Sequence, residues 1–281
     1  STIDRNKNLI PGEVLQQIIN GTQEVFDMLK SFGISINYLG GETADVGDVV
    51  RTIAVNGTMT SRWEKRKIIS NEKINDGDVI VGLASYGKAN YETQYNSGIG
   101  SNGLTSARHD VLYKKYASVY KESFDNNLPE DIIYAGKHEL TEKYADTTIG
   151  QMLLSPTRTY APVLKLLLQN YFDIIHGLIH CSGGGQTKCL KYLHSPFRII
   201  KDNLFAPLFK IIQQNSGSSL KEMYEVFNMG CRMELYCNRN NAATIIDIAN
   251  SFGIDAQIIG RVEAADKKQL IIAVNETELI Y

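Results

Sequence analysis

The first segment with chemical potential is Gly40-Gly41-Glu42-Thr43-Ala44-Asp45. Paired glycines let a backbone approach a ligand closely, and carboxylates hold magnesium beside phosphate groups. The segment is therefore a candidate for binding a nucleotide with its metal. The alternative is a tight turn whose acidic side chains are merely solvated, and spacing alone favours that alternative.

A second candidate runs from Ser97 to Leu104, where a glycine-rich loop leads into a predicted helix. The first turn of a helix has unpaired N–H groups and the positive end of the helix dipole, so it can hold an anion such as phosphate. Ser101 or Asn102 would serve equally well as an ordinary N-cap. The two interpretations are compatible.

The third candidate is His180-Cys181-Ser182-Gly183-Gly184-Gly185-Gln186-Thr187, in which a predicted strand feeds a helix. Three consecutive glycines lose much backbone entropy on folding, which favours a phosphate or substrate loop over a plain turn. The spacing is not that of a Walker P-loop. His176, His180, Cys181 and Cys189 suggest zinc at first sight, but strand positions four apart lie too far from each other for easy shared coordination.

The fourth candidate is the segment from Leu154 to Tyr160, in which Arg158 precedes a predicted helix. A guanidinium group can clamp a phosphate with two parallel hydrogen bonds. A capped helix with a solvated arginine is the alternative. The sequence contains neither a GxSxG nucleophile elbow nor an HExxH metal motif, which argues against the corresponding hydrolases.

The elements that must position these segments follow from hydrophobic periodicity. Apolar residues at helical spacing predict a helix from Pro11 to about Ser31, and alternation predicts a strand over residues 34–39 that runs into the Gly40–Asp45 turn. Residues 49–60 are also strand-like. Asn75-Asp76-Gly77 is a turn signal, which we interpret as the junction between a domain of residues 1–75 and a domain of residues 76–281.

The second domain is predicted to open on a buried strand at Val79–Ala84, and strands alternate with helices after it. This order predicts a layered α/β or α+β fold with helices covering sheets. Residues 87–100, rich in Asn, Tyr and Gly, are predicted to form an exposed loop. The further elements are predicted helices at 102–116, 158–171 and 242–252, and predicted strands at 174–181, 231–237, 256–259 and 270–274.

Composition excludes several classes of protein. The chain has 281 residues and a net charge of −2, so no overall field attracts nucleic acid or an anionic membrane. No apolar run approaches the roughly 20 residues that span a bilayer, and the polar start Ser1–Lys7 has no apolar signal core. We therefore expect a cytoplasmic protein. The four cysteines form no CxxC pair, and we expect buried free thiols.

Taken in order, six segments resemble the aminoimidazole ribonucleotide synthetase family, the phosphoribosylformylglycinamidine cyclo-ligases. The segments are GGETAD, DGDVIVGLASYG, GIGSNGLTSAR, LLSPTRTY, HCSGGGQTK and FNMGCRMEL. The resemblance implies ATP-dependent ring closure of formylglycinamidine ribonucleotide, in which the amide oxygen is phosphorylated and the neighbouring amine attacks the activated carbon. Aminoimidazole ribonucleotide, ADP and phosphate would be the products of this step in purine biosynthesis.

The resemblance also implies a homodimer that uses ATP and Mg²⁺, with its cleft between an N-terminal α/β domain and a C-terminal α/β domain. Residues 1–75 would be the later half of that first domain. Asn102 and His180 would be catalytic, and Glu42 and Asp45 would lie near the metal. The nucleotide would lie against Gly40, Gly41, Glu42, Thr43 and Asp45, and the substrate against Ser101, Asn102, Gly103, Thr157, Arg158, Gly183, Gly184 and Gly185.

Two departures from the family pattern stand out. DGVGTK-like and NDxxxxGA-like segments, usual upstream in the family's nucleotide site, are not in this sequence. The resemblance therefore implies that this sequence starts in mid-domain. The usual LHSNG reads Ile99-Gly100-Ser101-Asn102-Gly103, so Gly100 stands in place of a histidine. Tyr91, Tyr95 and His180 are the candidates to compensate. The missing segments and Gly100 also fit a non-catalytic binding or scaffold subunit.

Another enzyme of the same superfamily, of the selenophosphate synthetase or thiamin monophosphate kinase type, is a further alternative. LSPTRTY and FNMG favour the cyclo-ligase over these relatives. An isolated chain of this length would expose unpaired strand edges, so we expect it to be poorly stable or to aggregate.

Overall fold

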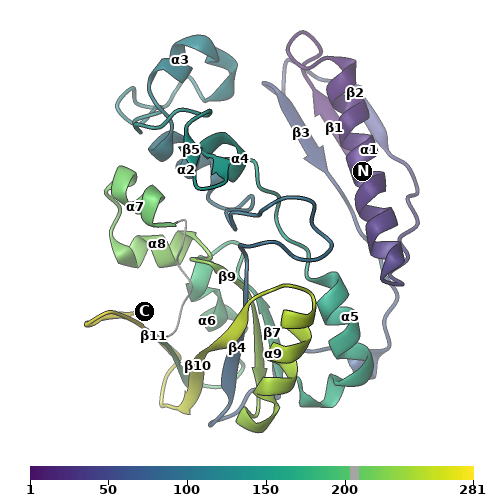
Figure 1. Ribbon diagram of the computed structural model, residues 1–281, viewed down its shortest axis with the longest axis vertical. Coiled ribbons are helices and arrows are strands. Elements are labelled where there is room, and N and C mark those ends of the chain that lie inside the picture. Colours follow the sequence, from purple (N-terminus) through teal and green to yellow (C-terminus); the bar gives the residue numbers. More distant parts are fainter. Residues whose placement is uncertain (203–208) are drawn as a thin grey trace.

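A computed structural model of the chain describes residues 1–202 and 209–281. These residues form a three-stranded sheet, a seven-stranded sheet and a small two-stranded sheet, with helices packed on them. The predicted layered α/β class is confirmed. Figure 1 shows the N-terminal sheet and its long helix alongside the larger body that carries the seven-stranded sheet.

The N-terminal sheet has the order β2-β1-β3. β1 (Thr2–Arg5) pairs in parallel with β2 (Glu42–Asp45) and antiparallel with β3 (Ile53–Asn56). Helix α1 (Gly12–Ser31) lies beside the sheet. The predicted helix is therefore confirmed, and its Leu15 and Leu29 are buried as its periodicity requires.

The predicted strand at residues 34–39 is wrong, and so is the predicted turn at Gly40–Asp45. Residues 34–41 are irregular, and the acidic segment is itself strand β2. The reason lies in strand pairing. β1 (Thr2–Arg5) pairs with Glu42–Asp45, in the register Thr2↔Glu42, and not with the residues that precede Glu42. Alternation alone does not make a strand when no partner strand lies beside it.

The seven-stranded sheet has the order β12-β11-β8-β10-β4-β9-β7. Its inner strands β4 (Val79–Ala84) and β9 (Cys231–Cys237) are buried at every residue, and their bounds are those that the sequence predicts. The remaining strands are β7 (Gly177–His180), β8 (Phe197–Lys201), β10 (Ala256–Ala264), β11 (Gln269–Val274) and β12 (Thr277–Ile280).

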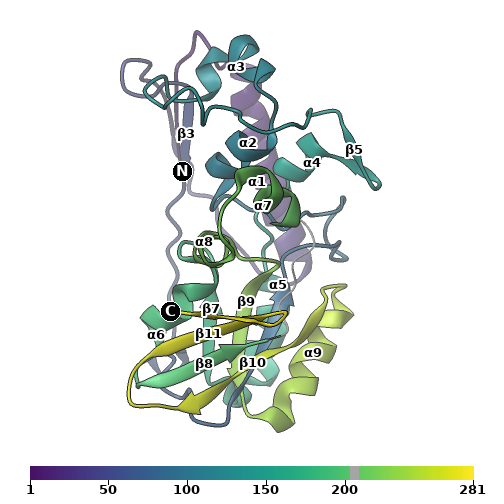
Figure 2. The same cartoon turned by 90° about the vertical axis from the view of Figure 1, so that its left-hand side faces the viewer.

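Residues of β4 and β9 alternate between two hydrophobic clusters, one on each face of the sheet. Val81 and Leu235 belong to the cluster that contains α5 and α9 residues, whereas Ile80 and Tyr236 belong to the cluster under α2, α7 and α8. Figure 2 shows these helices around the sheet. Their bounds are α2 (Leu104–Val111), α5 (Ala161–Asn170), α7 (Phe209–Ser216), α8 (Leu220–Val226) and α9 (Ala242–Ser251).

The predicted helix at 102–116 is broken in the structure. Leu112 and Tyr113 form bridges to His138 and Gly136, which end α2 and delay the next helix to α3 (Lys115–Val119). The region between α3 and α5 contains the hairpin of β5 (Lys143–Tyr144) and β6 (Thr147–Thr148), followed by α4 (Ile149–Leu153).

The four cysteines are free and buried, as predicted. Burial raises the pKa of the Cys189 thiol to about 11 and that of Cys237 to about 12. Among the described residues, no helix is both long enough and apolar enough to span a membrane.

Candidate functional site

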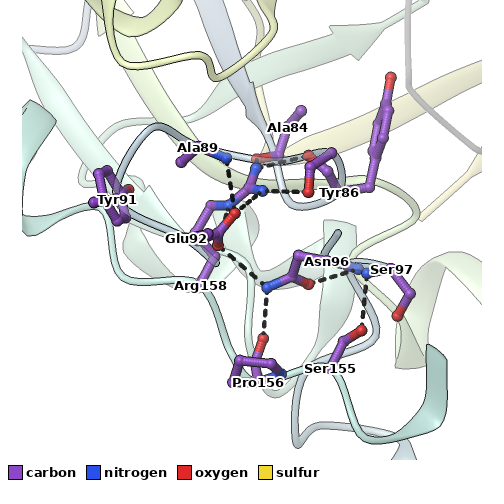
Figure 3. Close-up of polar contacts among 12 residues, drawn as sticks. Ala84, Tyr86, Ala89, Tyr91, Glu92, Asn96, Ser97, Ser155, Pro156 and Arg158 are labelled. Atoms are coloured by element: carbon purple, nitrogen blue, oxygen red, sulfur yellow. Dashed lines mark hydrogen bonds and ion pairs between the residues drawn. The ribbon is translucent and has the colours of Figure 1, made fainter. Parts of the chain in front are cut away.

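Arg158 is held within the body of the protein. Its Nε and Nη2 donate to the two carboxylate oxygens of Glu92, at 2.8 and 2.6 Å. The remaining N–H groups donate to the carbonyl oxygens of Ala84, Tyr86 and Gly87, at 2.7 to 3.0 Å (Figure 3). A guanidinium group has five N–H donors, and all five are used. The clamp on phosphate that the sequence suggested for Arg158 would break these bonds.

The loop of residues 87–100 is tied to the segment before α5. The Asn96 amide donates to the Pro156 carbonyl oxygen at 3.0 Å and accepts from the Gly98 N–H at 2.9 Å. Ser97 N–H donates to Ser155 Oγ at 3.0 Å. Residues 96–100 are buried, so the predicted exposed loop is exposed only in its first part. Arg158 and this loop form the support of the turn that follows.

The turn at residues 98–103 leads into α2, as the sequence predicts. Ser101 N–H donates to Thr157 Oγ1 at 3.1 Å, so two of the predicted substrate residues meet. Asn102 Nδ2 donates to the Val226 carbonyl oxygen at 2.7 Å. Gly103 has a φ of +79°, and a Cβ there would lie 2.4 Å from the Phe227 ring, which explains the glycine.

The triple-glycine turn follows β7 and meets the same region. A Cβ on Gly185 would lie 2.5 Å from the carbonyl oxygens of Phe227 and Tyr224, so the turn packs directly against the end of α8. A Cβ on Gly183 would lie 3.7 Å from Asn102 Oδ1. The structure therefore brings Gly183 to Gly185 together with Ser101 to Gly103, although 80 positions separate them.

A residue that the site prediction missed, Asn228, joins the turns. Its Oδ1 accepts from Ser85 Oγ at 2.7 Å and from the Gly230 N–H at 2.9 Å, and its Nδ2 donates to the Gly98 carbonyl oxygen at 2.9 Å. The signal was present in the FNMG segment, where Met229 and Gly230 both have positive φ. A tight turn of that kind needs a side chain that can satisfy its backbone groups.

A buried ion pair lies beneath the glycine turn. Lys201 Nζ lies 2.5 Å from Glu234 Oε1, and both side chains are fully buried. The same ammonium donates to the Gln186 carbonyl oxygen at 2.8 Å, and Gln186 Nε2 donates to the Asn228 carbonyl oxygen at 2.5 Å. Because Gln186 directly follows Gly185, this network fixes the glycine turn on the sheet.

His180 lies at the end of β7, where its residue is exposed. Partial desolvation lowers its pKa, and the positive charges of Arg232 and Lys188 lower it further. The imidazole is therefore neutral near pH 7 and can accept a proton. His176 instead lies 2.8 Å from the buried Asp78 carboxylate, so the two histidines do not share a ligand.

The segment Gly40–Asp45 does not join this cluster. It forms the edge strand β2, and among the described residues no hydrogen bond or ion pair connects it with the two glycine turns. Asp45 is paired with Lys7 at 3.0 Å, and that contact lowers the pKa of its carboxyl. Glu42 and Asp45 are three positions apart, so they point to opposite faces of the strand.

Within residues 1–202 and 209–281, no group of three or more His, Cys, Asp or Glu side chains is placed to hold a metal ion. The assignment of Glu42 and Asp45 to the metal stays a prediction. A pocket of about 590 Å³ lies between α1 and the segments around Tyr91 and Thr157.

The comparisons with known proteins identify the family. A family model described as AIR synthase related protein, C-terminal domain, matches residues 75–273. The chain belongs to this family. Five of the six segments lie within the matched residues, and the resemblance to the family is confirmed.

Two curated archaeal relatives of the family carry the name phosphoribosylformylglycinamidine cyclo-ligase. The relative from Methanocaldococcus jannaschii is 34% identical over 256 residues, which cover 90% of this chain and 62% of the relative. The relative from Methanobrevibacter smithii is 30% identical over 270 residues, covering 96% of this chain and 67% of the relative. The chain thus spans about two thirds or less of the length of these relatives.

Solved structures support the fold. The crystal structure of Escherichia coli HypE, a hydrogenase maturation protein, aligns with a TM-score of 0.55 at 14% identity, over 100% of this chain and 71% of the other. Another crystal structure of the hydrogenase maturation protein HypE aligns with a TM-score of 0.56 at 12% identity, over 99% of this chain and 74% of the other. The likeness is one of fold.

Proposed function

We propose that the chain is part of a phosphoribosylformylglycinamidine cyclo-ligase, which converts formylglycinamidine ribonucleotide and ATP to aminoimidazole ribonucleotide, ADP and phosphate. The observation that carries the proposal is the convergence of Ser101–Gly103, Gly183–Gly185 and the turn at Asn228. Backbone turns without Cβ atoms let a phosphate-bearing ligand approach N–H groups closely. The family and the names of its relatives support the same reaction.

In the proposed reaction, the amide oxygen of the substrate attacks the terminal phosphorus of ATP, and ADP leaves. The amine nitrogen then attacks the activated carbon, loses a proton, and phosphate leaves. His180 is suited to accept that proton because its imidazole is neutral near pH 7. Ser101, Asn102, Gly103 and Thr157, with Gly183 to Gly185, would hold the substrate in place.

ATP and Mg²⁺ belong to the proposal as co-substrate and cofactor. The metal would neutralise charge on the phosphates of the nucleotide. Gly40, Gly41, Glu42, Thr43 and Asp45 are the residues we assign to the nucleotide, with Glu42 and Asp45 nearest to the metal. Water and the phosphate oxygens of the nucleotide would supply further ligands, as is usual for Mg²⁺.

We further propose that the protein is a homodimer that forms through the N-terminal element. Helix α1 exposes apolar side chains at Val14, Ile19 and Val25, and Val55 is exposed on the edge strand β3. Exposed apolar groups on neighbouring elements are common where chains associate.

An assay of ADP release with the full-length protein tests the proposal. ADP should form only when formylglycinamidine ribonucleotide, ATP and magnesium are all present. Asn102→Asp should lower kcat/KM at least about tenfold, because a carboxylate beside the glycine turn repels a phosphate. Asn8→Asp, on the exposed N-terminal surface, is the control and should be unaffected. ADP release independent of the ribonucleotide would refute the proposed reaction.

A further inference from the structure

Arg232 is a second buried arginine, located at the start of β9. It is 2% exposed, and its Nη2 donates to the carbonyl oxygens of Gly98 and Ile99, at 3.0 and 2.9 Å. The guanidinium group therefore lies directly beneath the turn that leads to α2. None of the sequence patterns singled it out as a functional residue.

Among the described residues, the charge of Arg232 has no counter-charge. Its buried Nε has no hydrogen-bond partner, and no carboxylate of the described residues lies within ion-pair distance of the guanidinium group. A buried charge without a partner is expensive, by several kcal/mol in order of magnitude. Such a group is expected where a ligand supplies the opposite charge.

Gly100 marks where that charge lies. A Cβ at Gly100 would be 2.1 Å from Arg232 Nη2 and 2.5 Å from Cζ, and Gly100 has a φ of +60°. The guanidinium group thus fills the space that a side chain at position 100 would take. The charge of Arg232, which belongs to β9, therefore lies beside position 100, where the LHSNG segment of the resembled family carries a histidine.

The contacts of Arg232 also orient the turn. In a trans peptide the C=O and N–H groups point in opposite directions. Because the Ile99 carbonyl oxygen faces Arg232, the Gly100 N–H points away from the guanidinium group. The N-terminus of α2 follows directly, and its unpaired N–H groups add to the positive potential.

One further cation, Lys188, lies near the same place. Lys188 Nζ donates to Ser182 Oγ at 2.5 Å, just before the triple-glycine turn. After desolvation, the positive charges of Arg232 and Lys188 also lower the pKa of His180. The two turns are thus bordered by positive charge from β9 and from the segment after β7.

We propose that Arg232 is a positioning residue that supplies the positive charge for a phosphate group bound at the Gly98–Gly103 turn. It acts through the turn, whose carbonyl oxygens it holds, and through its field. The identity of the phosphate rests on the proposed function, in which it belongs either to the ribonucleotide substrate or to the nucleotide.

Calorimetric binding to the full-length protein tests this proposal, with formylglycinamidine ribonucleotide and ATP–magnesium as separate probes. Arg232→Met should weaken the Kd of one probe at least about tenfold, whereas Arg232→Lys should keep most of the affinity. The affected probe identifies the source of the phosphate. The salt dependence of that Kd should fall in Arg232→Met and persist in Arg232→Lys. Arg261→Met, which removes an exposed arginine on β10, is the matched control.

The double variant Gly100→His with Arg232→Gly guards against a loss that only reflects misfolding. Below about pH 6.5, where histidine is largely protonated, this variant places the cation at the turn instead of on β9 and removes the steric overlap, so it should then bind the affected probe more tightly than Arg232→Gly alone. Unchanged binding of both probes by Arg232→Met would overturn the proposal. Equal losses in the Met and Lys variants would do so as well, because packing would then explain them.

The two proposals fail in different ways. If the unaltered protein forms no aminoimidazole ribonucleotide yet binds inorganic pyrophosphate in an Arg232-dependent manner, the proposed reaction is wrong and the role of Arg232 stands. If turnover is normal and Arg232→Met changes no Kd and no salt dependence, the reverse holds.

Discussion

Arg158 and Arg232 are both buried beside the loop that runs from Tyr86 to Gly103, yet their surroundings differ. Arg158 uses all five donors and has the Glu92 carboxylate as its counter-charge. Arg232 donates to two carbonyl oxygens and has an orphaned Nε without a carboxylate. The first arginine has its counter-charge in Glu92, whereas the second has no counter-charge among the described residues.

This difference assigns the two arginines different roles: Arg158 supports the loop, and Arg232 is the one we propose to act on a ligand. A saturated guanidinium group holds a loop in place and has nothing left to offer a ligand. A buried guanidinium group with an unused N–H and no counter-charge, such as that of Arg232, leaves positive charge uncompensated next to the turn that it contacts. Residue type did not distinguish the two, because the distinction depends on which groups meet them in the fold.

The largest expected difference is in stability. Arg158→Met should lower the free energy of unfolding by about 3 kcal/mol or more, since it strands the Glu92 carboxylate and three carbonyl oxygens. Arg232→Met should lower it by about 1 kcal/mol, because two lost hydrogen bonds are offset by removal of an unpaired charge. Urea unfolding of the two variants measures both values. Equal losses of unfolding free energy in the two variants would contradict the difference that we infer between the two arginines.

A smaller difference is expected for the glycines beside the two arginines. Gly87 and Gly100 both have positive φ, so alanine strains the backbone at each. A Cβ at Gly87 meets nothing within 4 Å, whereas at Gly100 it meets Arg232. Gly100→Ala should therefore destabilise the protein by about 1 to 3 kcal/mol more than Gly87→Ala. The excess should shrink in an Arg232→Met background, and an unchanged excess would place the clash elsewhere.

The smallest effect concerns His180. Desolvation and then Arg232 lower its pKa, so Arg232→Met should raise that pKa part of the way toward its ordinary value. Arg158→Met should leave it unchanged. A lowered histidine pKa means that the unfolded chain binds more protons, so this contribution to stability is lost as pH falls below roughly 6.5. NMR titration of the His180 ring measures the pKa, and a shift of the same size in both variants would contradict the assignment.

Elements with a strong local pattern could be predicted from sequence. β4 is a run of apolar residues buried on both faces, and α1 has a regular helical stripe. β9 was predicted with the same bounds, although it also buries Arg232 and Glu234. β1, β8 and β12 were not predicted, because each forms by pairing with neighbouring strands that only the folded structure brings beside it. For the same reason residues 34–39 alternate like a strand without forming one.

The candidate site was predicted in part. Glycine spacing indicated the turns at 98–103 and 183–185, because few other residues adopt their backbone conformations. The role of Arg158 was not predictable, since Glu92 lies 66 positions away from it in the chain. Arg232 escaped notice because nothing local reveals that a distant glycine leaves room for it.

The buried cysteines can report local opening of the protein, because their thiols react only when they become exposed. Burial raises the pKa of the Cys189 and Cys231 thiols, so they carry almost no thiolate at neutral pH, and a buried thiol is not reached by a reagent. Cys231 precedes Arg232 on β9, and Cys189 lies on the short helix after the glycine turn. The rate of alkylation at those two sulfurs would therefore measure how often the sheet beneath the glycine turns opens, and a bound phosphate that tightens the turns would lower that rate.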